Sequence, residues 1–163
     1  MTQNDDIRIG IGYDIHRLAG DRKLVLGGLE IPYDRGLLGH SDADVVLHAV
    51  TDALLGAAGL PDIGDLFPDT DDAYKDADSR DLLLDVMRRI SDRGFRVGNL
   101  DVIVHAETPK MTPHKKPMGA SIAKVVGVDS GRVNVKAKTN EGVGPVGLSN
   151  AIACTTVALL VRG

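Results

Sequence analysis

Two short segments of the chain contain residue types that bind divalent metal ions. Residues 10–17 read Gly-Ile-Gly-Tyr-Asp-Ile-His-Arg, and residues 39–48 read Gly-His-Ser-Asp-Ala-Asp-Val-Val-Leu-His. In a strand, Asp14 and His16 project from the same face, and His48 offers a third donor. One carboxylate and two imidazoles form a three-ligand site with an open position, which is the arrangement of a catalytic zinc site. An aspartate and a histidine on one strand face are more often simply exposed to solvent. The surrounding residues therefore have to decide between solvent exposure and metal binding.

The first segment has the alternation of a β-strand. Ile7, Ile9, Ile11, Tyr13 and Ile15 fall on one face, whereas the other face carries Gly10, Gly12, Asp14 and His16. Because glycine has no side chain, we expect the two glycines to leave room for an ion and its ligand close to the backbone.

The second segment opens a predicted helix that runs from Ser41 to Gly59. Ser41 is expected to cap the helix, and Asp44 completes a capping box three residues later. Asp44, His48 and Asp52 are spaced four residues apart and share a helix face. This face is either a solvated stripe or a pair of carboxylates that hydrogen-bond the second nitrogen of the His48 ring, which would fix the imidazole for a metal.

The start of the same helix is also a candidate phosphate site. His40 and Ser41 lie where backbone N–H groups are free and the helix dipole is positive. Ser41 acting only as a cap is the plainer alternative, but His40 has no structural duty that the sequence reveals.

Three loops complete the candidate residues. Residues 62–71 mix aspartates with apolar residues within a longer loop, 62–78, and lack the spacing of a calcium loop. Residues 106–112 join a predicted strand to a predicted helix, the usual rim of an α/β ligand site. Residues 138–141 end another strand beside a glycine-rich turn, where Glu141 would hold a magnesium ion between phosphate oxygens.

The composition excludes several classes of protein. Of 163 residues, 43% are hydrophobic and 26% charged, which is ordinary for one globular domain. The net charge of −4 disfavours nucleic acid as a partner, and no apolar run is long enough for a membrane span. The acidic start at residues 4–6 is not a signal peptide. The single Cys154 excludes an internal disulfide and favours a reducing, cytoplasmic compartment.

The remaining elements predict a two-layer α/β (α+β) fold. We expect one domain over residues 1–163, with a disordered tail at residues 1–6 and one mixed sheet with helices on one face. The expected elements after the first helix and strand are a hairpin at 24–31, helices at 79–93 and 112–127, and strands at 97–106, 132–139 and 152–161. The other face of the sheet then has no helices over it. Association with other subunits is the simplest way to cover that face.

Several longer motifs occur in order along the chain. They are Gly12–Arg17, Gly39–Val45, Thr51–Gly56, Asp62–Gly64, Leu66–Asp71, Pro109–Met111 and Val133–Ala137. With these motifs the chain closely resembles the 2-C-methyl-D-erythritol 2,4-cyclodiphosphate synthases from Ile7 onward. The resemblance implies a cytoplasmic or plastid homotrimer, with sheets packed around the trimer axis and active sites between subunits.

The resemblance also implies a reaction and its cofactors. The enzyme would be a metal-dependent phosphorus–oxygen lyase of the non-mevalonate isoprenoid pathway. It would convert 4-diphosphocytidyl-2-C-methyl-D-erythritol 2-phosphate into the cyclic diphosphate and CMP. One Zn²⁺ per subunit falls on Asp14, His16 and His48, and Mg²⁺ or Mn²⁺ bound with the diphosphate falls on Glu141.

Further roles follow from the same resemblance. His40 and Thr139 match positions that stabilise the transition state, and His40 and Ser41 meet the 2-phosphate. The residues matched to substrate binding are Asp14, Ile15, His16, His40, Ser41, Asp62, Ile63, Gly64, Phe67, Pro68, Asp69, Thr70, Asp71, Ala106, Glu107, Thr108, Pro109, Lys110, Met111, Thr112, Lys138, Thr139, Asn140 and Glu141. The loop residues among them surround the methylerythritol and ribose, and residues 106–112 and 138–141 form the cytidine pocket.

One segment departs from the family pattern. Relatives often carry a phenylalanine and an arginine that line an axial cavity for an isoprenoid diphosphate, where this chain has Pro145 and Leu148. Leucine lacks a guanidinium and proline lacks a backbone N–H, so we expect weak binding of such a diphosphate at the axis.

Two other functions remain open from the residues alone. A zinc-dependent phosphohydrolase would cleave a nucleotide diphosphate with an activated water. A non-catalytic trimer would bind cytidine nucleotides without turnover.

Overall fold

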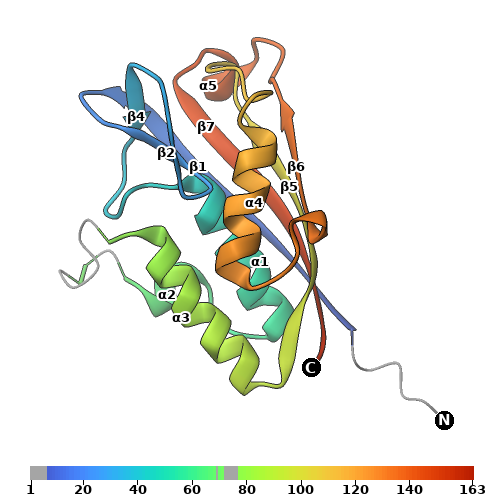
Figure 1. Ribbon diagram of the computed structural model, residues 1–163. Helices are drawn as coiled ribbons and strands as arrows, with labels where there is room; N and C mark the ends of the chain where they lie inside the picture. The colour runs from blue at the N-terminus through green and yellow to red at the C-terminus, as the bar shows by residue number, and fades with distance from the viewer. Residues whose placement is uncertain (1–6, 69, 72–76) are drawn as a thin grey trace.

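The computed structural model describes residues 7–68, 70–71 and 77–163. Its elements are β1 (Ile7–Gly20), β2 (Leu24–Leu26), β3 (Leu29–Ile31), β4 (Arg35–Leu37), α1 (Val45–Ala58), α2 (Ile63–Leu66), α3 (Ser79–Asp92), β5 (Phe95–His105), α4 (Lys115–Val126), η2 (Ser130–Arg132), β6 (Val133–Lys138), α5 (Gly144–Gly147) and β7 (Ala151–Arg162). They form two layers, a sheet and a set of helices against it (Figure 1). The tail expected at residues 1–6 lies outside the described residues.

The main sheet is mixed, as predicted. Its five strands have the order β4-β1-β7-β5-β6. β7 pairs antiparallel with both β1 and β5, whereas β5 and β6 are parallel. β1 and β5 therefore run in the same direction, and their carboxyl ends lie at the same end of the sheet. The predicted hairpin forms a separate two-stranded sheet, β2-β3.

The core lies between the sheet and helices α1, α3 and α4. The apolar face of β5, with Leu100, Val102 and Val104, is fully buried there. Helix α1 is buried on most of its surface because it lies across β1 and β7 with α3 on its outer side. Removal of this apolar surface from water is the main stabilisation of the fold. No helix within the described ranges is long and apolar enough to cross a membrane.

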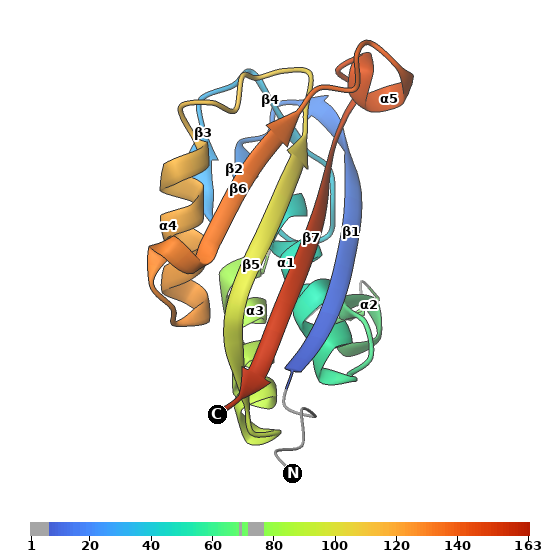
Figure 2. The ribbon, with the colours of Figure 1, turned by 90° about the vertical axis from the view of Figure 1, so that its right-hand side faces the viewer.

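The opposite face of the sheet is open in this chain. In Figure 2 the strands face the viewer, with α1 and α3 behind them and α4 beside β6. The isoleucine face of β1 lies on this open side: Ile9 is 69% exposed, Ile11 is 70% exposed and Tyr13 is 57% exposed. A soluble monomer seldom exposes so continuous an apolar strip. The prediction that one face of the sheet is left without helices is thus confirmed.

Several predicted boundaries were wrong. The helix expected from Ser41 begins at Val45, because Ala43 takes a left-handed conformation (φ 58°) that no α-helix includes. The helix expected from Thr112 begins at Lys115. The loop at 62–78 contains α2, and the turn at 141–147 contains α5. The three-residue strand β4 was missed because so short a segment shows no alternation.

Candidate metal centre and active site

Gly10 and Gly12 set the distance between β1 and α1. A Cβ atom at Gly10 would lie 2.0 Å from the Ala53 carbonyl oxygen, and one at Gly12 would lie 2.0 Å from that of Ala49. The expectation that these glycines leave room for an ion was therefore wrong, since the backbone of α1 fills the space. The close packing instead brings His48 of α1 over Asp14 and His16 of β1.

The three predicted metal ligands meet in space. Asp14 Oδ2 lies 3.0 Å from His16 Nε2 and 3.0 Å from His48 Nδ1. The two ring nitrogens are also 3.0 Å apart. Within the described part of the chain, these residues form a group that could hold a metal ion.

This triangle of donor atoms fits a small tetrahedral ion. Zinc bound at ~2.0–2.1 Å in tetrahedral geometry needs its ligand atoms roughly 3.3–3.4 Å apart. The triangle therefore has to open by only a few tenths of an ångström, which side-chain rotation supplies. The two imidazole nitrogens favour zinc over magnesium or calcium, which prefer oxygen ligands.

The charges at the triangle are strongly coupled. Burial alone would raise the pKa of Asp14, but hydrogen bonds to His16 and His48 outweigh it and hold this pKa well below its usual range. Burial would lower the pKa of His48, but the Asp14 hydrogen bond and charge reverse the shift and raise it. Protons thus compete with a metal for the same donor atoms, so metal binding has to release protons.

Cys154 is the β7 neighbour of Asp14 but is no ligand candidate. The two residues are paired across β1 and β7. Burial raises the pKa of the Cys154 thiol to about 12, so it stays protonated at neutral pH. The thiolate is the form that binds metals, so the aspartate and histidines remain the donor set.

The second nitrogen of the His48 ring is held by two serines. His48 Nε2 lies 3.0 Å from Ser79 Oγ and 3.1 Å from Ser41 Oγ. Ser79 is the first residue of α3 and is buried. Sequence reasoning missed Ser79, because nothing in the spacing links residue 79 to residue 48.

Asp44 does not have the predicted role beside His48. Its carboxylate is completely buried and caps α1, accepting hydrogen bonds from the N–H groups of Val46 and Leu47. It also accepts from Gly27 and Gly28 of the β2–β3 turn. Burial raises the pKa of Asp44 to about 6, although these N–H donors oppose the shift. The expected hydrogen bond to the His48 ring is absent from the described contacts of Asp44, and only its charge reaches that ring.

The same contacts correct the expected phosphate site. Asp44 takes the first N–H groups of α1, so they are not free to bind an anion. Ser41 is not the cap; its hydroxyl accepts a hydrogen bond from Ala43 N and faces His48. His40 and Ser41 can therefore meet a phosphate through their side chains rather than through the helix terminus.

Asp52 anchors a loop at the site. Its Oδ1 accepts a hydrogen bond from Ile63 N, at the start of α2. Burial raises its pKa. Within the described residues no hydrogen bond joins Asp52 to the His48 ring, so the carboxylate supports the predicted substrate loop rather than the imidazole.

A pocket of about 490 Å³ opens over the predicted metal ligands. Its lining combines Asp14, His16 and His48 with residues of the predicted substrate loop. Its lining residues are Asp14, His16, Gly39, His40, Ser41, His48, Asp52, Ile63, Gly64, Phe67 and Leu82. Leu82 was not predicted from the sequence. Asp62 caps α2 and does not line the pocket. The structure also describes Ile15, Pro68, Thr70 and Asp71, and none of these four lines the pocket. Asp69 lies outside the described residues.

The other predicted residues form a second group. Because β5 and β6 are parallel, their carboxyl ends bring residues 106–112 beside residues 138–141. Ala106 N donates to Lys138 O, and Asn140 N donates to Glu107 Oε2. The Thr139 hydroxyl donates to Glu141 Oε1 at 2.9 Å. None of these described residues lines the pocket over the predicted metal ligands. One chain thus presents two separate halves of the predicted site.

The segment that departs from the family pattern borders the open face. Leu148 follows α5 and is 66% exposed. Pro145 lines a hollow together with Ile15 and Arg17 of β1 and Asn150. The predicted weak binding of an isoprenoid diphosphate there stays a prediction.

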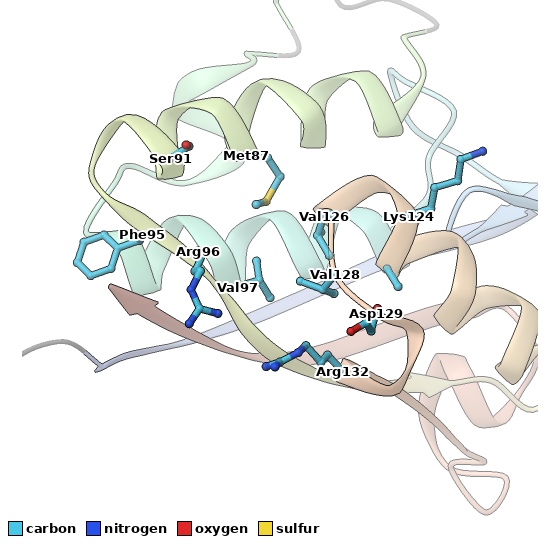
Figure 3. A pocket seen from close by; sticks show the side chains of 12 residues that line it. Met87, Ser91, Phe95, Arg96, Val97, Lys124, Val126, Val128, Asp129 and Arg132 are labelled. Atoms are coloured by element: carbon cyan, nitrogen blue, oxygen red, sulfur yellow. The ribbon is translucent and has the colours of Figure 1, made fainter. Parts of the chain in front are cut away.

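A further hollow of about 650 Å³ lies away from the predicted site residues. It is enclosed by the end of α3, the start of β5 and the end of α4 with η2 (Figure 3). Met87, Val97, Val126 and Val128 supply apolar walls, and Arg132 is engaged by the Gly98 carbonyl. Ser91 of α3 lines this hollow (Figure 3). It lies near the end of the helix, whereas Ser79 is the first residue of that helix.

Known proteins resemble the chain over nearly its whole length. The model of the YgbB family matches residues 7–161. A curated relative from Bordetella petrii is 57% identical over 159 residues, which is 98% of both chains. One from Erwinia tasmaniensis is 55% identical over 156 residues, or 96% of this chain and 99% of the relative. Both carry the name 2-C-methyl-D-erythritol 2,4-cyclodiphosphate synthase.

Solved structures share the fold. The bifunctional IspDF from Campylobacter jejuni matches with a TM-score of 0.93 and 40% identity. The match covers 97% of this chain but 43% of that longer one. The CDP complex of IspF from Plasmodium falciparum matches with a TM-score of 0.86 and 35% identity, over 98% of this chain and 99% of the other.

Proposed function

This chain belongs to the YgbB family, and on that basis we propose that it catalyses the reaction for which its curated relatives are named. It converts 4-diphosphocytidyl-2-C-methyl-D-erythritol 2-phosphate into 2-C-methyl-D-erythritol 2,4-cyclodiphosphate with release of CMP, in non-mevalonate isoprenoid biosynthesis. The observation that carries this proposal is the triangle of Asp14, His16 and His48 inside a pocket that His40 and Ser41 also line.

Two metal sites belong to the proposal. One zinc ion per subunit would be held by Asp14, His16 and His48, and Mg²⁺ or Mn²⁺ would be held by Glu141 together with the diphosphate. Such cations supply positive charge against the diphosphate, which lets one anion approach another. The donor distances support the zinc site. The exposed carboxylate of Glu141 beside Thr139 supports the second site.

The residues of the chain then hold the substrate. His40 and Ser41 would bind the 2-phosphate from the pocket that the metal ligands share. Residues 62–64 and 67–71 would surround the methylerythritol and ribose, with Asp52 fixing the start of that loop through Ile63 N. Residues 106–112 and 138–141 would bind the cytidine, in keeping with a relative solved as a CDP complex.

The proposed chemistry needs no strong general base. A phosphate monoester is already ionised near neutral pH, so the 2-phosphate can attack as it is. The attack is intramolecular, and holding the substrate folded supplies much of the acceleration. His40 and Thr139 would donate hydrogen bonds to charge that develops in the transition state.

We propose a homotrimer with active sites between subunits. Two observations support it: the apolar strip on the open face of β1, and the division of the predicted site into two halves on one chain. A trimer that packs its open faces together would bury the strip and let a neighbouring subunit supply the second half. In sedimentation velocity, Ile11→Asp on the open face is expected to dissociate the assembly. Leu84→Asp, at a 40% exposed position on α3, is the matched control.

The domain and the location are further parts of the proposal. We place residues 1–163 in one domain, of which the family model covers 7–161. We place the protein in the cytoplasm, where a single buried cysteine stays reduced.

Product analysis tests the function directly. Purified protein with substrate and Mg²⁺ is expected to form the cyclic diphosphate and CMP, and a zinc chelator is expected to stop the reaction. Phosphorus NMR separates this from the alternatives. A linear bisphosphate with CMP would indicate a phosphohydrolase, and CDP binding without turnover would indicate a nucleotide-binding trimer.

A further inference from the structure

The His48 ring is held from behind by a chain of hydrogen bonds that leads to Asp42. The Ser79 hydroxyl donates to Asp42 Oδ1 at 2.5 Å, and Ser79 N donates to Asp42 Oδ2 at 3.1 Å. Ser79 Oγ also lies 3.0 Å from His48 Nε2. The chain Asp42–Ser79–His48 therefore links the loop before α1 to the first turn of α3 and to the proposed metal ligand.

The direction of these hydrogen bonds fixes the position of a proton. A hydroxyl has one hydrogen, and Ser79 gives it to the Asp42 carboxylate. Towards His48, Ser79 can offer only a lone pair. The favourable arrangement is then a proton on His48 Nε2, which donates to Ser79. The opposite tautomer would set two lone pairs against each other at 3.0 Å.

Ser41 does not change this assignment. Its hydroxyl lies 3.1 Å from the same nitrogen and can accept a share of the same proton. If Ser41 donated to Nε2 instead, the Ser79 contact would become repulsive.

We propose that Asp42 and Ser79 are positioning residues that hold His48 in the Nε2-protonated tautomer and so direct the lone pair of Nδ1 at the metal. Nδ1 is the nitrogen that forms the triangle with Asp14 and His16. A hydrogen-bonded partner on the far nitrogen orients a metal-binding imidazole and raises its basicity. This inference rests on the proposed zinc site and adds the groups that prepare it.

Asp42 is itself held firmly. Its backbone N–H donates to Ala77 O, and its Oδ1 also accepts from Asp44 N. Between them, Ala43 adopts a left-handed conformation. Asp42 thus contacts Ser79, whereas Asp44 contacts the β2–β3 turn. The loop at 41–44 separates the carboxylate that supports the metal ligand from the one that caps the helix.

Zinc affinity measured by competition with a chromophoric chelator tests the proposal without substrate. Ser79→Ala leaves Ser41 as the remaining acceptor for Nε2–H and breaks the link to Asp42, and we expect zinc to bind roughly 10–100-fold more weakly. Asp42→Asn is expected to act in the same direction, because either orientation of an amide sets an NH₂ group against a Ser79 contact. Ser91→Ala, on the same helix beside the separate hollow of Figure 3, is the matched control and should bind zinc like the wild type.

A second measurement reads the tautomer itself. Nitrogen-15 NMR of the His48 side chain in the zinc-loaded protein is expected to show a proton on Nε2 and the metal on Nδ1. A metal bound through Nε2 would overturn the proposal. So would Ser79→Ala and Asp42→Asn variants that bind zinc within twofold of the wild type. If the wild-type protein took up no zinc, the proposed metal site would itself be refuted, and this inference with it.

Discussion

Replacement of Gly12 by alanine is expected to disturb the fold and the metal site together. The new methyl group would point at α1, 2.0 Å from the Ala49 carbonyl oxygen and 2.7 Å from Ala53 N. Both atoms belong to the backbone of a buried helix, so no flexible side chain can move aside. The helix as a whole has to move away from β1.

The size of that movement follows from ordinary contact distances. Non-bonded contacts of a Cβ atom begin near 3.4 Å, which is 1.4 Å more than the 2.0 Å available. Overpacking of a core typically costs about 1–3 kcal/mol, and we expect the upper end because the obstacle is backbone. For a chain of this size, 3 kcal/mol corresponds to a fall in Tm of roughly 6–12 °C.

The same movement separates His48 from Asp14 and His16. Metal–ligand distances tolerate deviations of only about 0.2 Å, so a shift near 1 Å removes one ligand. We expect zinc affinity to fall by at least ~100-fold, the upper end of the loss that follows removal of a supporting group.

Calorimetry and chelator competition on purified protein measure both effects. Gly20→Ala is the matched control, because it is the same substitution on the same strand with no atom within 4 Å of the new Cβ. If Gly12→Ala melted within about 2 °C of this control and bound zinc equally well, the claim that the glycine positions α1 would be refuted.

Three further predictions concern single side chains. His48→Ala should lose zinc and nearly all turnover while keeping its circular dichroism spectrum, and full zinc occupancy measured by atomic absorption would disprove the ligand assignment. Glu141→Gln should impair turnover more than zinc binding, because Glu141 lies outside the triangle, and an unchanged magnesium dependence of the rate would argue against its role. His105 has a pKa that burial lowers from 6.5, so its neutral form is favoured in the fold and it stabilises the protein above that pH. As the pH falls through the lowered pKa this contribution is lost, and urea unfolding at pH 5 and 7.5 should show a smaller acid loss in His105→Gln than in the wild type.

Local patterns were sufficient for several elements and for the ligand types. The alternation over β1 predicted both of its faces, including the side that carries Asp14 and His16. The helix expected at 79–93 and the hairpin expected at 24–31 are both present, as α3 and as β2 paired with β3. Such patterns succeed because one face of each element meets the core, and this requirement is visible within a few residues of sequence.

Other features depended on contacts between distant segments. Spacing within a helix suggested that Asp44 would support His48, yet Asp44 lies before the helix and is bound by Gly27 and Gly28. Ser79, more than thirty residues away, takes that place beside the ring. A hydrogen bond of this kind exists only once two elements have packed, so no periodicity in the chain reveals it.

The sequence by itself thus determined which residue types are available for metal binding and which strand and helix carry them, since residue types and local alternation are properties of short segments. The tertiary structure decided how the ligands meet. Two glycines, which the sequence suggested were space for an ion, prove to be the surface on which α1 rests. Their small size fixes the separation of two backbones, and that separation places His48 Nδ1 at 3.0 Å from Asp14 Oδ2. Only the packed chain contains that distance, because it joins atoms that the sequence leaves thirty-four residues apart.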